Sequence, residues 1–480
     1  MTTRAISRRA VLQGAAATSL TLALPGLARA RTTADVVVIG AGLSGLNAAL
    51  LLEQQDLDVI VLEGRNRVGG RVNSLDSVPG SPEAGANAIV GSYARLRDAA
   101  RRFGAELVDH STSSKLNRPK TLALGGEIIP TQEWPDSARN PFQAAQKETL
   151  PWQFVSRLIS QENPLESPGD WFDPKFSSHD IPLYEFLKHQ GASDAVIELA
   201  YNTNIIFGTS AHDVSLLQML GNDFWMKLQR AIERVSLVGK GGNQRIPEAM
   251  ARNLSREVAF GKKVSGIRSN ADGAEVYCTD GSRYTARQVI CSIPVPVLRN
   301  VQFDPVFTSV QERAIKTVAY APCTQVHMVA KKPFWEDDGL PAAMWTDSKA
   351  GFVVSNRNDD APEEITSLTA WGRGFLARYL DRLGPDGAKA AVIRAIEELR
   401  PAAKGQLEAL YVKSWELDEF AGGADFMVWG PGQVTEFFGE LWAPHGRVHF
   451  CGEHTAMLER GMEGAMESGE RAALEVLERI

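Results

Sequence analysis

Cysteine is scarce in this chain of 480 residues. The four cysteines, Cys278, Cys291, Cys323 and Cys451, stand far apart, and no two of them form a CxxC pair. No group of His and Cys residues has the spacing of a zinc site. We therefore expect buried thiols and no metal centre.

Long runs of like charge are also missing. The formal net charge is −7, and the charged residues, 23% of the chain, are spread along it. Without a basic patch, the sequence favours neither nucleic acid nor an anionic membrane surface as a partner. No internal repeat or low-complexity tract occurs. The 44% of hydrophobic residues is typical of a soluble globular protein, and the length predicts two or three domains.

The first thirty residues have the pattern of a targeting segment. The run from Ser7 to Leu12 contains Arg8-Arg9 and resembles a twin-arginine export signal. An apolar stretch follows, but it is too short and too polar to span a bilayer comfortably. Ala28-Arg29-Ala30 has the small-x-small form of a cleavage site. We expect recognition by the twin-arginine translocase, cleavage near Ala30 and a periplasmic or secreted mature protein of net charge about −11, since the segment holds four arginines and no acids; a retained membrane anchor is the alternative.

A glycine-rich turn follows this segment. Val36–Ile39 is a β-branched apolar run, as a strand buried on both faces requires. In Gly40-x-Gly42-x-x-Gly45, the first glycine allows the tight turn and the second lets backbone approach a pyrophosphate. The third lets the helix pack on the strand. Leu46–Leu52 is predicted to form that helix, with its amino-terminal amides facing the phosphates.

An acid stands where a dinucleotide site needs one. Val59–Leu62 is predicted to be a second strand, and Glu63 follows it. A carboxylate at this position can accept hydrogen bonds from ribose hydroxyls and would repel a 2′-phosphate. We conclude that the chain binds a dinucleotide; a strand-to-helix turn without a ligand is the alternative.

Several ordered segments carry a family resemblance. Glu63–Arg71 resembles the segment after the ribose acid in FAD enzymes of the monoamine oxidase and L-amino-acid oxidase superfamily. Further stretches similar to that family are Glu83–Asn87, Gly241–Pro247, Gly261–Val264, Ile290–Pro294, Lys332–Gly339 and Phe450–Ala473. The matches extend from about residue 35 to about residue 475. They favour FAD over NAD as the main cofactor.

The resemblance implies a fold and a domain organisation. The class is α/β: a Rossmann-like FAD-binding domain of the glutathione-reductase type plus an α+β substrate-binding domain, as in monoamine oxidase and L-amino-acid oxidase. The FAD-binding domain is expected over residues 31–108, 236–297 and 416–480. The substrate-binding domain is expected over 109–235 and 298–415. A homodimer is left open.

The hydrophobic periodicity of the two substrate-domain segments, 109–235 and 298–415, predicts their secondary structure. Residues 111–180 are expected to form loops with short helices. Helical spacing is present over 181–203, 215–235 and 388–399, and strands are predicted at 324–329 and 365–371.

The motif and the resemblance together imply the FAD contacts. They are Gly40, Gly42, Leu43, Ser44, Gly45, Glu63, Arg65, Gly70, Arg71, Gly85, Ala86, Asn87, Val264, Trp415, Gly452, Glu453 and Met462. By analogy Gly70 and Arg71 lie along the pyrophosphate and flavin, and Glu453 lies near the ribityl-phosphate. The helix that begins near Met462 would point its amides at N1 and O2 of the flavin.

The implied reaction needs no nucleophile or metal. A flavin oxidises an amine by accepting the α-hydride at N5, so the protein supplies a dry pocket and orienting groups. The candidate catalytic residues are Gln325, Trp415 and Asp425. Trp415 matches the family tryptophan near the flavin.

The pocket departs from the monoamine oxidase pattern. Gly422-Gly423-Ala424-Asp425 replaces a Gly-Gly-Cys-Tyr run, so Ala424 offers no thiol and the FAD should be non-covalent. Asp425 removes one aromatic wall, and Gly461 stands where the second aromatic is expected. Phe426 and Trp429 either rebuild the pocket or belong to the core.

Two charge differences bear on substrate and oxygen. In both oxidase branches a Thr-Lys pair brings a lysine that contacts flavin N5 through a water; here the pair is Thr324-Gln325. We therefore expect sluggish reoxidation by O2, or transfer to a redox acceptor protein, unless His327 or a lysine such as Lys331 restores the charge. Ala88 stands where L-amino-acid oxidases have a carboxylate-binding arginine, although Arg95 or another arginine could serve.

The favoured function is FAD-dependent oxidation of a primary or secondary amine to an imine, with reoxidation by O2 to hydrogen peroxide or by another acceptor. The alternatives are an L-amino-acid oxidase, a flavin desaturase of C–C or ring bonds, and a flavoprotein that binds a partner without turnover.

Overall fold

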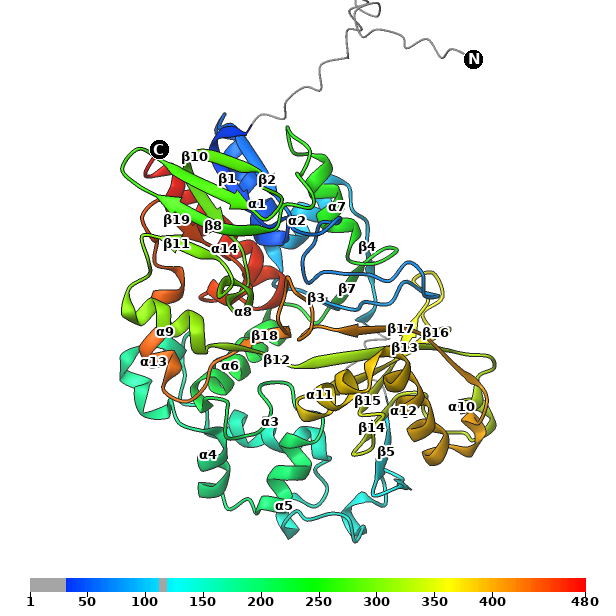
Figure 1. The fold of residues 1–480 in the computed structure, drawn as a ribbon. Coiled ribbons are helices and arrows are strands. Elements are labelled where there is room, and N and C mark those ends of the chain that lie inside the picture. The colour runs from blue at the N-terminus through cyan, green and yellow to red at the C-terminus, as the bar shows by residue number, and fades with distance from the viewer. Residues whose placement is uncertain (1–31, 112–118) are drawn as a thin grey trace, which may run out of the picture. The chain divides into compact units, whose positions relative to one another are not determined.

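The predicted first strand is β1, Thr33–Ile39, and Val36 to Ile39 are buried in it. The computed structural model describes residues 32–111 and 119–480, of which 33–480 form one unit (Figure 1). The predicted export signal, residues 1–30, lies outside the described residues.

The first seven-stranded sheet carries the parallel core. Its strand order is β11-β8-β9-β10-β1-β2, with β19 paired to β10. Strands β2, β1, β10 and β19 are mutually parallel neighbours, whereas β8, β9 and β10 are antiparallel. The bounds are β2 Val59–Leu62, β8 Val264–Ser269, β9 Ala274–Cys278, β10 Arg283–Cys291, β11 Gln302–Asp304 and β19 Val448–Phe450.

Two helices from opposite ends of the chain lie together on this sheet. They are α1, Leu43–Glu53, and α14, Gly461–Leu477. The Asn47 side chain donates a hydrogen bond to the Met466 carbonyl at 2.8 Å and so joins them. Figure 1 shows the blue and red helices side by side, which brings the first and last motifs of the sequence together.

The second seven-stranded sheet is mostly antiparallel. Its order is β17-β13-β16-β15-β14-β5-β6, and only β14 and β5 pair in parallel. Helices α11, Phe375–Arg382, and α12, Gly384–Leu399, share one apolar cluster with this sheet. The strands are β5 Thr121–Leu124, β6 Glu127–Ile129, β13 Cys323–Ala330, β14 Met344–Thr346, β15 Phe352–Arg357, β16 Ile365–Arg373 and β17 Leu407–Ser414.

Smaller elements complete the described part of the chain. One small sheet has the order β3-β7-β4, from Ile89–Val90, Ser236–Gly239 and Leu107–Asp109; the other pairs β12, Ala319–Ala321, with β18, Ala424–Val428. The remaining helices are α2 Ala94–Phe103, α3 Pro151–Glu162, α4 Leu183–His189, α5 Asp194–Ile197, α6 Leu216–Ile232, α7 Arg245–Arg252, α8 Val295–Leu298, α9 Ser309–Thr317, α10 Phe334–Asp337 and α13 Gln433–Phe437.

Most predicted elements are confirmed, and two are corrected. The continuous helix expected over 181–203 is broken into α4, α5 and a π-turn at Glu198–Asn202, because Gly191 adopts a left-handed φ of 79° after α4. The loop-rich interval 111–180 also contains β5, β6 and the twelve-residue α3. The helices predicted over 215–235 and 388–399 correspond to α6 and α12.

The mixed α/β class is confirmed, with parallel and antiparallel sheets. Strand β11 lies beyond residue 297 yet pairs with β8 of the first sheet. Strand β7, from the predicted FAD-binding range, belongs to neither large sheet. The predicted domain boundaries therefore stay a proposal.

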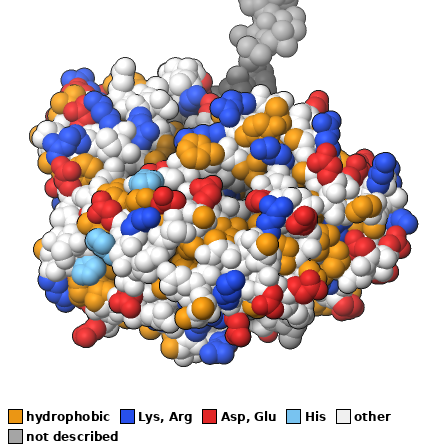
Figure 2. All heavy atoms as spheres, turned by 90° about the horizontal axis from the view of Figure 1, so that it is seen from below, with side chains coloured by type: hydrophobic (Ala, Val, Ile, Leu, Met, Phe, Trp, Pro, Cys, Tyr) orange, Lys and Arg blue, Asp and Glu red, His pale blue; other side chains and the backbone are white. Residues whose placement is uncertain are grey.

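Acidic and basic side chains are interspersed on the face in Figure 2, around hydrophobic side chains near its centre. None of the helices in residues 32–111 and 119–480 combines the length and apolar character that crossing a bilayer requires.

Candidate active site

A cavity of about 1370 Å³ extends from the glycine-rich turn after β1 to one side of α6. It collects most of the residues predicted from the sequence. Those on its wall are Gly40, Leu43, Ser44, Glu63, Arg65, Gly70, Arg71, Gly85, Ala86, Asn87, Ala88, Val264, Trp415, Phe426, Gly452, Glu453, Gly461 and Met462. Gly42, Gly45, Gln325 and Trp429 are absent from the wall. The side chain of Asp425 lies outside the described residues.

The glycine-rich turn forms a cradle for a phosphate. A Cβ at Gly45 would lie 2.0 Å from the Gly40 carbonyl oxygen, so only glycine lets α1 approach the turn this closely. A Cβ at Gly42 would meet nothing within 4 Å, which leaves open space over the turn. No side chain caps the start of α1, where Gly42 is the N-cap. The uncapped amides of this helix are therefore available to an anion.

Glu63 fixes the turn to the end of β2. Its Oε2 accepts a hydrogen bond from the Ala41 amide at 2.9 Å, and its Oε1 accepts one from the Arg65 amide at 2.8 Å. The residue is 5% exposed and lies on the cavity wall. Each carboxylate oxygen retains a lone pair, so Glu63 can also accept from two ribose hydroxyls.

The segment Gly241–Pro247 supports the wall from behind. The Asn243 side chain donates to the carbonyls of Ala86 and Asn87 at 2.8 and 3.0 Å. The Asn243 amide donates to Glu83 Oε1 at 2.7 Å. The stretch Gly85–Asn87 is thereby held as a fixed part of the wall.

Arg71 and Glu453 form an ion pair at the wall. Arg71 Nη2 lies 3.3 Å from Glu453 Oε2 and 3.2 Å from the Tyr320 hydroxyl. Burial raises the pKa of Glu453, and the Arg71 charge opposes that rise. Glu453 thus orients Arg71, a role that the sequence resemblance did not indicate.

The start of α14 faces the same cavity. Gly461 and Met462 lie on the wall, and no side chain caps the first amides of the helix. Two uncapped helix starts, an open glycine turn and an acid at a strand end are the features that bind the phosphates, ribose and flavin of FAD. The described residues therefore fit this cofactor. They contain no group of three or more His, Cys, Asp or Glu side chains that could hold a metal ion.

A family model named flavin containing amine oxidoreductase matches residues 43–477. The chain belongs to this family. Its cofactor is accordingly FAD.

Similar relatives and solved structures extend over nearly the whole chain. A zebrafish (Danio rerio) flavin-containing amine oxidase is 28% identical over 465 residues, covering 92% of this chain and 85% of that protein. An L-amino-acid oxidase of Vipera ammodytes ammodytes is 25% identical, covering 95% of each. Cyclohexylamine oxidase from Brevibacterium oxydans has a similar fold, with a TM-score of 0.74 at 21% identity, covering 93% and 99% of the two chains. Wild-type putrescine oxidase bound to putrescine gives a TM-score of 0.72 at 21% identity, with the same coverage.

The other end of the amine oxidoreductase cavity is aromatic. Phe426 stacks on Phe207 with ring centroids 5.6 Å apart, and both line the wall. Tyr93, Trp225 and Trp371 line it as well. The sequence prediction found only Phe426 of these, because the others are brought in by loops and helices far away in sequence. Among these residues only Trp371 had a local indication in the sequence, because it is the last residue of the predicted strand 365–371.

Trp429 packs in the core, the second of the two alternatives that the sequence left open. It is 2% exposed and packs against Trp171 and Phe438, with centroids 6.5 and 5.7 Å away. Its backbone amide is not available to a substrate, because it donates a hydrogen bond to Gln218 Oε1 at 2.8 Å.

Gln325 is also set back from the cavity. Its Oε1 lies 3.2 Å from His327 Nε2, and the side chain is buried on β13. Trp371 stands opposite it on β16 and reaches the wall, while Lys413 stands opposite it on β17. The predicted catalytic position of Gln325 is therefore corrected to one behind the wall. Lys331 is not near this point, since its Nζ donates to the Gly405 carbonyl at the exposed end of the strand.

Of the two arginines Arg95 and Arg373, only Arg373 lines the cavity. Arg95 pairs with Glu463 and Glu470 and does not line the cavity, so it is not placed to clamp a substrate carboxylate. Arg373 does line the cavity, and its guanidinium carbon lies 4.5 Å from the centroid of the Trp371 ring.

Proposed function

We propose that this protein oxidises a primary or secondary amine to the imine, which water then hydrolyses. The observation that carries the proposal is the continuous cavity in a chain of the flavin amine oxidoreductase family. It joins the dinucleotide cradle to an aromatic lobe, which consists of Tyr93, Phe207, Trp225, Trp371 and Phe426. The flavin, when bound, supplies the hydride acceptor. The relatives named as amine oxidases support the same reaction class.

The protein's own residues hold and enclose the reactants. Phe207, Phe426 and Trp371 offer apolar surface that excludes water from the reacting C–H bond. Trp415 donates from Nε1 to the Ala84 carbonyl at 2.6 Å, which fixes its ring on the wall. A neutral amine fits such a surface without a charged partner.

Amine is favoured over amino acid by the arginines. Arg65 pairs with Asp418 at 2.5 Å, and Arg71 pairs with Glu453, so each guanidinium already has a carboxylate partner. The second candidate is an L-amino-acid oxidase, which Arg373 on the cavity wall and the viper relative support.

One assay separates the candidates. The FAD-loaded enzyme is mixed without oxygen with panels of amines, L-amino acids, polyenes and porphyrinogens, and flavin absorbance is followed. We expect bleaching by amines. Bleaching by amino acids alone would favour the second candidate, bleaching by polyenes or porphyrinogens a desaturase, and no bleaching by any panel a binding protein.

We also propose export by the twin-arginine translocase to the periplasm or beyond the cell. The support is the sequence pattern around Arg8-Arg9 and Ala28–Ala30. This route carries folded proteins, so FAD can be inserted before export. Electrons would then pass to O2 or to an acceptor outside the cytoplasm.

A further inference from the structure

One polar group on the aromatic lobe lacks a partner. Tyr93 precedes α2, lines the cavity and is 5% exposed. Within the described part of the chain its side chain contacts the Trp225 ring, 6.4 Å between centroids, and its hydroxyl makes no hydrogen bond. Because Tyr93 lies on the cavity wall, its hydroxyl is open to the cavity and can make a hydrogen bond to a ligand there.

The hydroxyl packs against Gly461. A Cβ at Gly461 would lie 2.8 Å from Tyr93 Oη and 3.8 Å from Phe426 Cε1, and Gly461 has a φ of 58°. A side chain at position 461 would therefore collide with the Tyr93 hydroxyl, and glycine leaves room for it. Tyr93, Phe426 and Gly461 all belong to the cavity wall, so a ligand that enters the cavity can reach the hydroxyl.

Three acidic residues act on this hydroxyl, and burial raises the pKa of each of them as well. Burial raises the pKa of Tyr93 well above its usual range, and the carboxylates of Glu459, Glu463 and Glu453 raise it further. The hydroxyl is thus a neutral group in a negative field. Such a field attracts a cation and repels a carboxylate.

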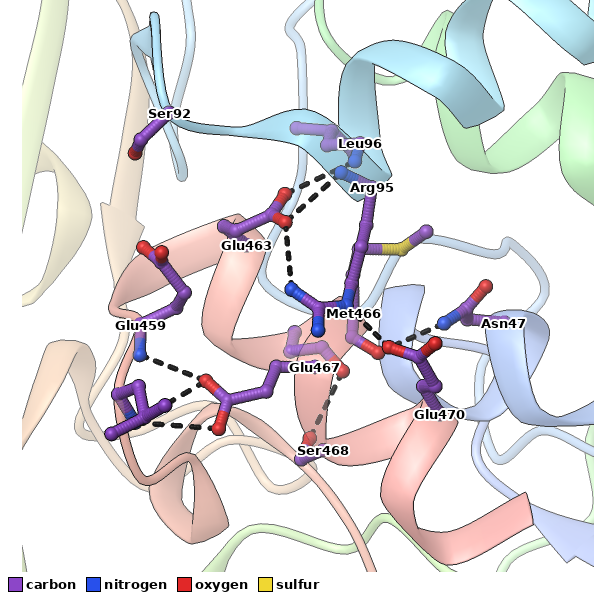
Figure 3. Close-up of polar contacts among 12 residues, drawn as sticks. Asn47, Ser92, Arg95, Leu96, Glu459, Glu463, Met466, Glu467, Ser468 and Glu470 are labelled. Atoms are coloured by element: carbon purple, nitrogen blue, oxygen red, sulfur yellow. Dashed lines mark hydrogen bonds and ion pairs between the residues drawn. The ribbon is translucent and has the colours of Figure 1, made fainter. Parts of the chain in front are cut away.

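These carboxylates are held by specific contacts. Glu463 accepts hydrogen bonds from the amides of Arg95 and Leu96, both at 3.0 Å, and so joins the start of α14 to the start of α2 (Figure 3). Glu459 Oε2 accepts from Trp225 Nε1 at 2.9 Å, which ties a cavity-wall ring to a carboxylate behind it.

Three arginines pair with or face these carboxylates. Arg71 lies 3.3 Å from Glu453, and Arg95 lies 3.3 Å from Glu463 and also pairs with Glu470. Arg460 stacks over the Trp171 ring at 4.3 Å and faces Glu453, Glu459 and Glu467. None of the three is a free anion site beside Tyr93. Arg71 lies on the cavity wall but is paired with Glu453, and Arg95 and Arg460 do not line the cavity.

We propose that Tyr93 Oη accepts a hydrogen bond from the ammonium group of an organic amine, and that this end of the cavity selects ammonium ions against carboxylates. The faces of Trp225 and Phe426 add cation–π attraction to the same group. This inference rests on the proposed function: the amine enters the site as the ammonium ion and releases one proton to solvent before hydride transfer, which requires the neutral nitrogen.

The test uses two ligands that share a tert-butyl group and carry opposite charges. tert-Butylammonium has no α-hydrogen and so cannot be oxidised, and pivalate is its carboxylate counterpart. Each is titrated into the FAD-loaded enzyme by calorimetry. We expect tert-butylammonium to bind and pivalate not to bind. Tyr93→Phe should weaken tert-butylammonium roughly tenfold or more, since it removes one hydrogen bond to a charged group.

Controls keep the test decisive. Tyr184→Phe removes a hydroxyl that donates to Asp194 at 2.8 Å outside the cavity, and should leave binding unchanged. Glu459→Gln should weaken tert-butylammonium while the Tyr93 hydroxyl remains. FAD content and melting temperature report whether each variant is folded.

The contrary outcomes are clear. Equal binding to Tyr93→Phe and to the parent, or pivalate binding as tight as tert-butylammonium, overturns the inference even if amines bleach the flavin. Conversely, if no amine bleaches the flavin but Tyr93→Phe still loses tert-butylammonium, the ammonium site stands and the proposed oxidation fails.

Discussion

Replacing Glu63 with glutamine should weaken FAD binding and also destabilise the protein without FAD. The two carboxylate oxygens accept the Ala41 and Arg65 amides at 2.9 and 2.8 Å. In Glu63→Gln one oxygen becomes an NH₂ group, which cannot accept. One backbone amide of a buried turn therefore loses its partner, and the ribose loses a charged acceptor.

The magnitudes of the two effects can be worked separately. An unsatisfied buried amide costs about 1–3 kcal/mol of unfolding free energy. A hydrogen bond to a charged group contributes about 1.5–3 kcal/mol, so its loss weakens FAD roughly 10- to 150-fold. Glu63→Lys should be more severe, since it removes both acceptors and adds a cation beside the turn.

The assay titrates apoprotein with FAD and follows the quenching of flavin fluorescence, with chemical unfolding measured in parallel. Glu53→Gln is the matched control. Glu53 accepts the Ser255 amide at 3.0 and 3.2 Å but does not line the cavity, so its loss should spare FAD affinity. An FAD dissociation constant for folded Glu63→Gln within twofold of the parent would refute the role of Glu63.

Three further predictions follow from the sequence and the site. Acid precipitation should release all of the yellow colour as free FAD, because Ala424 offers no thiol; colour in the pellet would contradict this. Changing Arg8 and Arg9 to Lys should retain the protein in the cytoplasm, whereas an unchanged periplasmic yield would indicate another route. Gln325→Lys should speed reoxidation of the reduced enzyme by oxygen in stopped-flow mixing.

The dinucleotide cradle was predictable because its determinants are local. A β-branched run, a glycine turn and an acid at the next strand end occupy Val36 to Glu63, and each constrains its own backbone. The structure brings Gly40, Glu63 and Val264 to one wall as expected. The distant Met462 joins them through the packing of α14 on α1, which the order of family motifs indicated.

The aromatic lobe was much less predictable. Phe426 and Trp429 were treated alike, although residues three apart in an extended segment point to opposite sides. Alternation along β18 thus carried a signal that only one of them could face the cavity. Tyr93 and Trp225 had no such signal, because they come from the start of α2 and from α6 and meet only in the tertiary structure.

The oxygen prediction depends on how charge is arranged behind the cavity wall. Lys413 faces Gln325 across the sheet, and its Nζ lies 4.2 Å from the centroid of the Trp415 ring. It cannot simply replace a lysine at position 325, because its Nζ is held in an ion pair with Asp418, which also pairs with Arg65. Burial moreover lowers the pKa of Lys413.

A lysine at position 325 would act differently. Its side chain is one bond longer than that of glutamine, so it can extend past the His327 contact toward the wall that Trp371 reaches. A cation there lowers the barrier to superoxide formation, whereas substrate reduction of the flavin needs no such charge. We therefore expect Gln325→Lys to accelerate reoxidation with little change in anaerobic reduction, and Lys413→Met to leave the parent's slow reoxidation unchanged. If Gln325→Lys is no faster than the parent, or if Lys413→Met is slower, the missing charge is not at position 325.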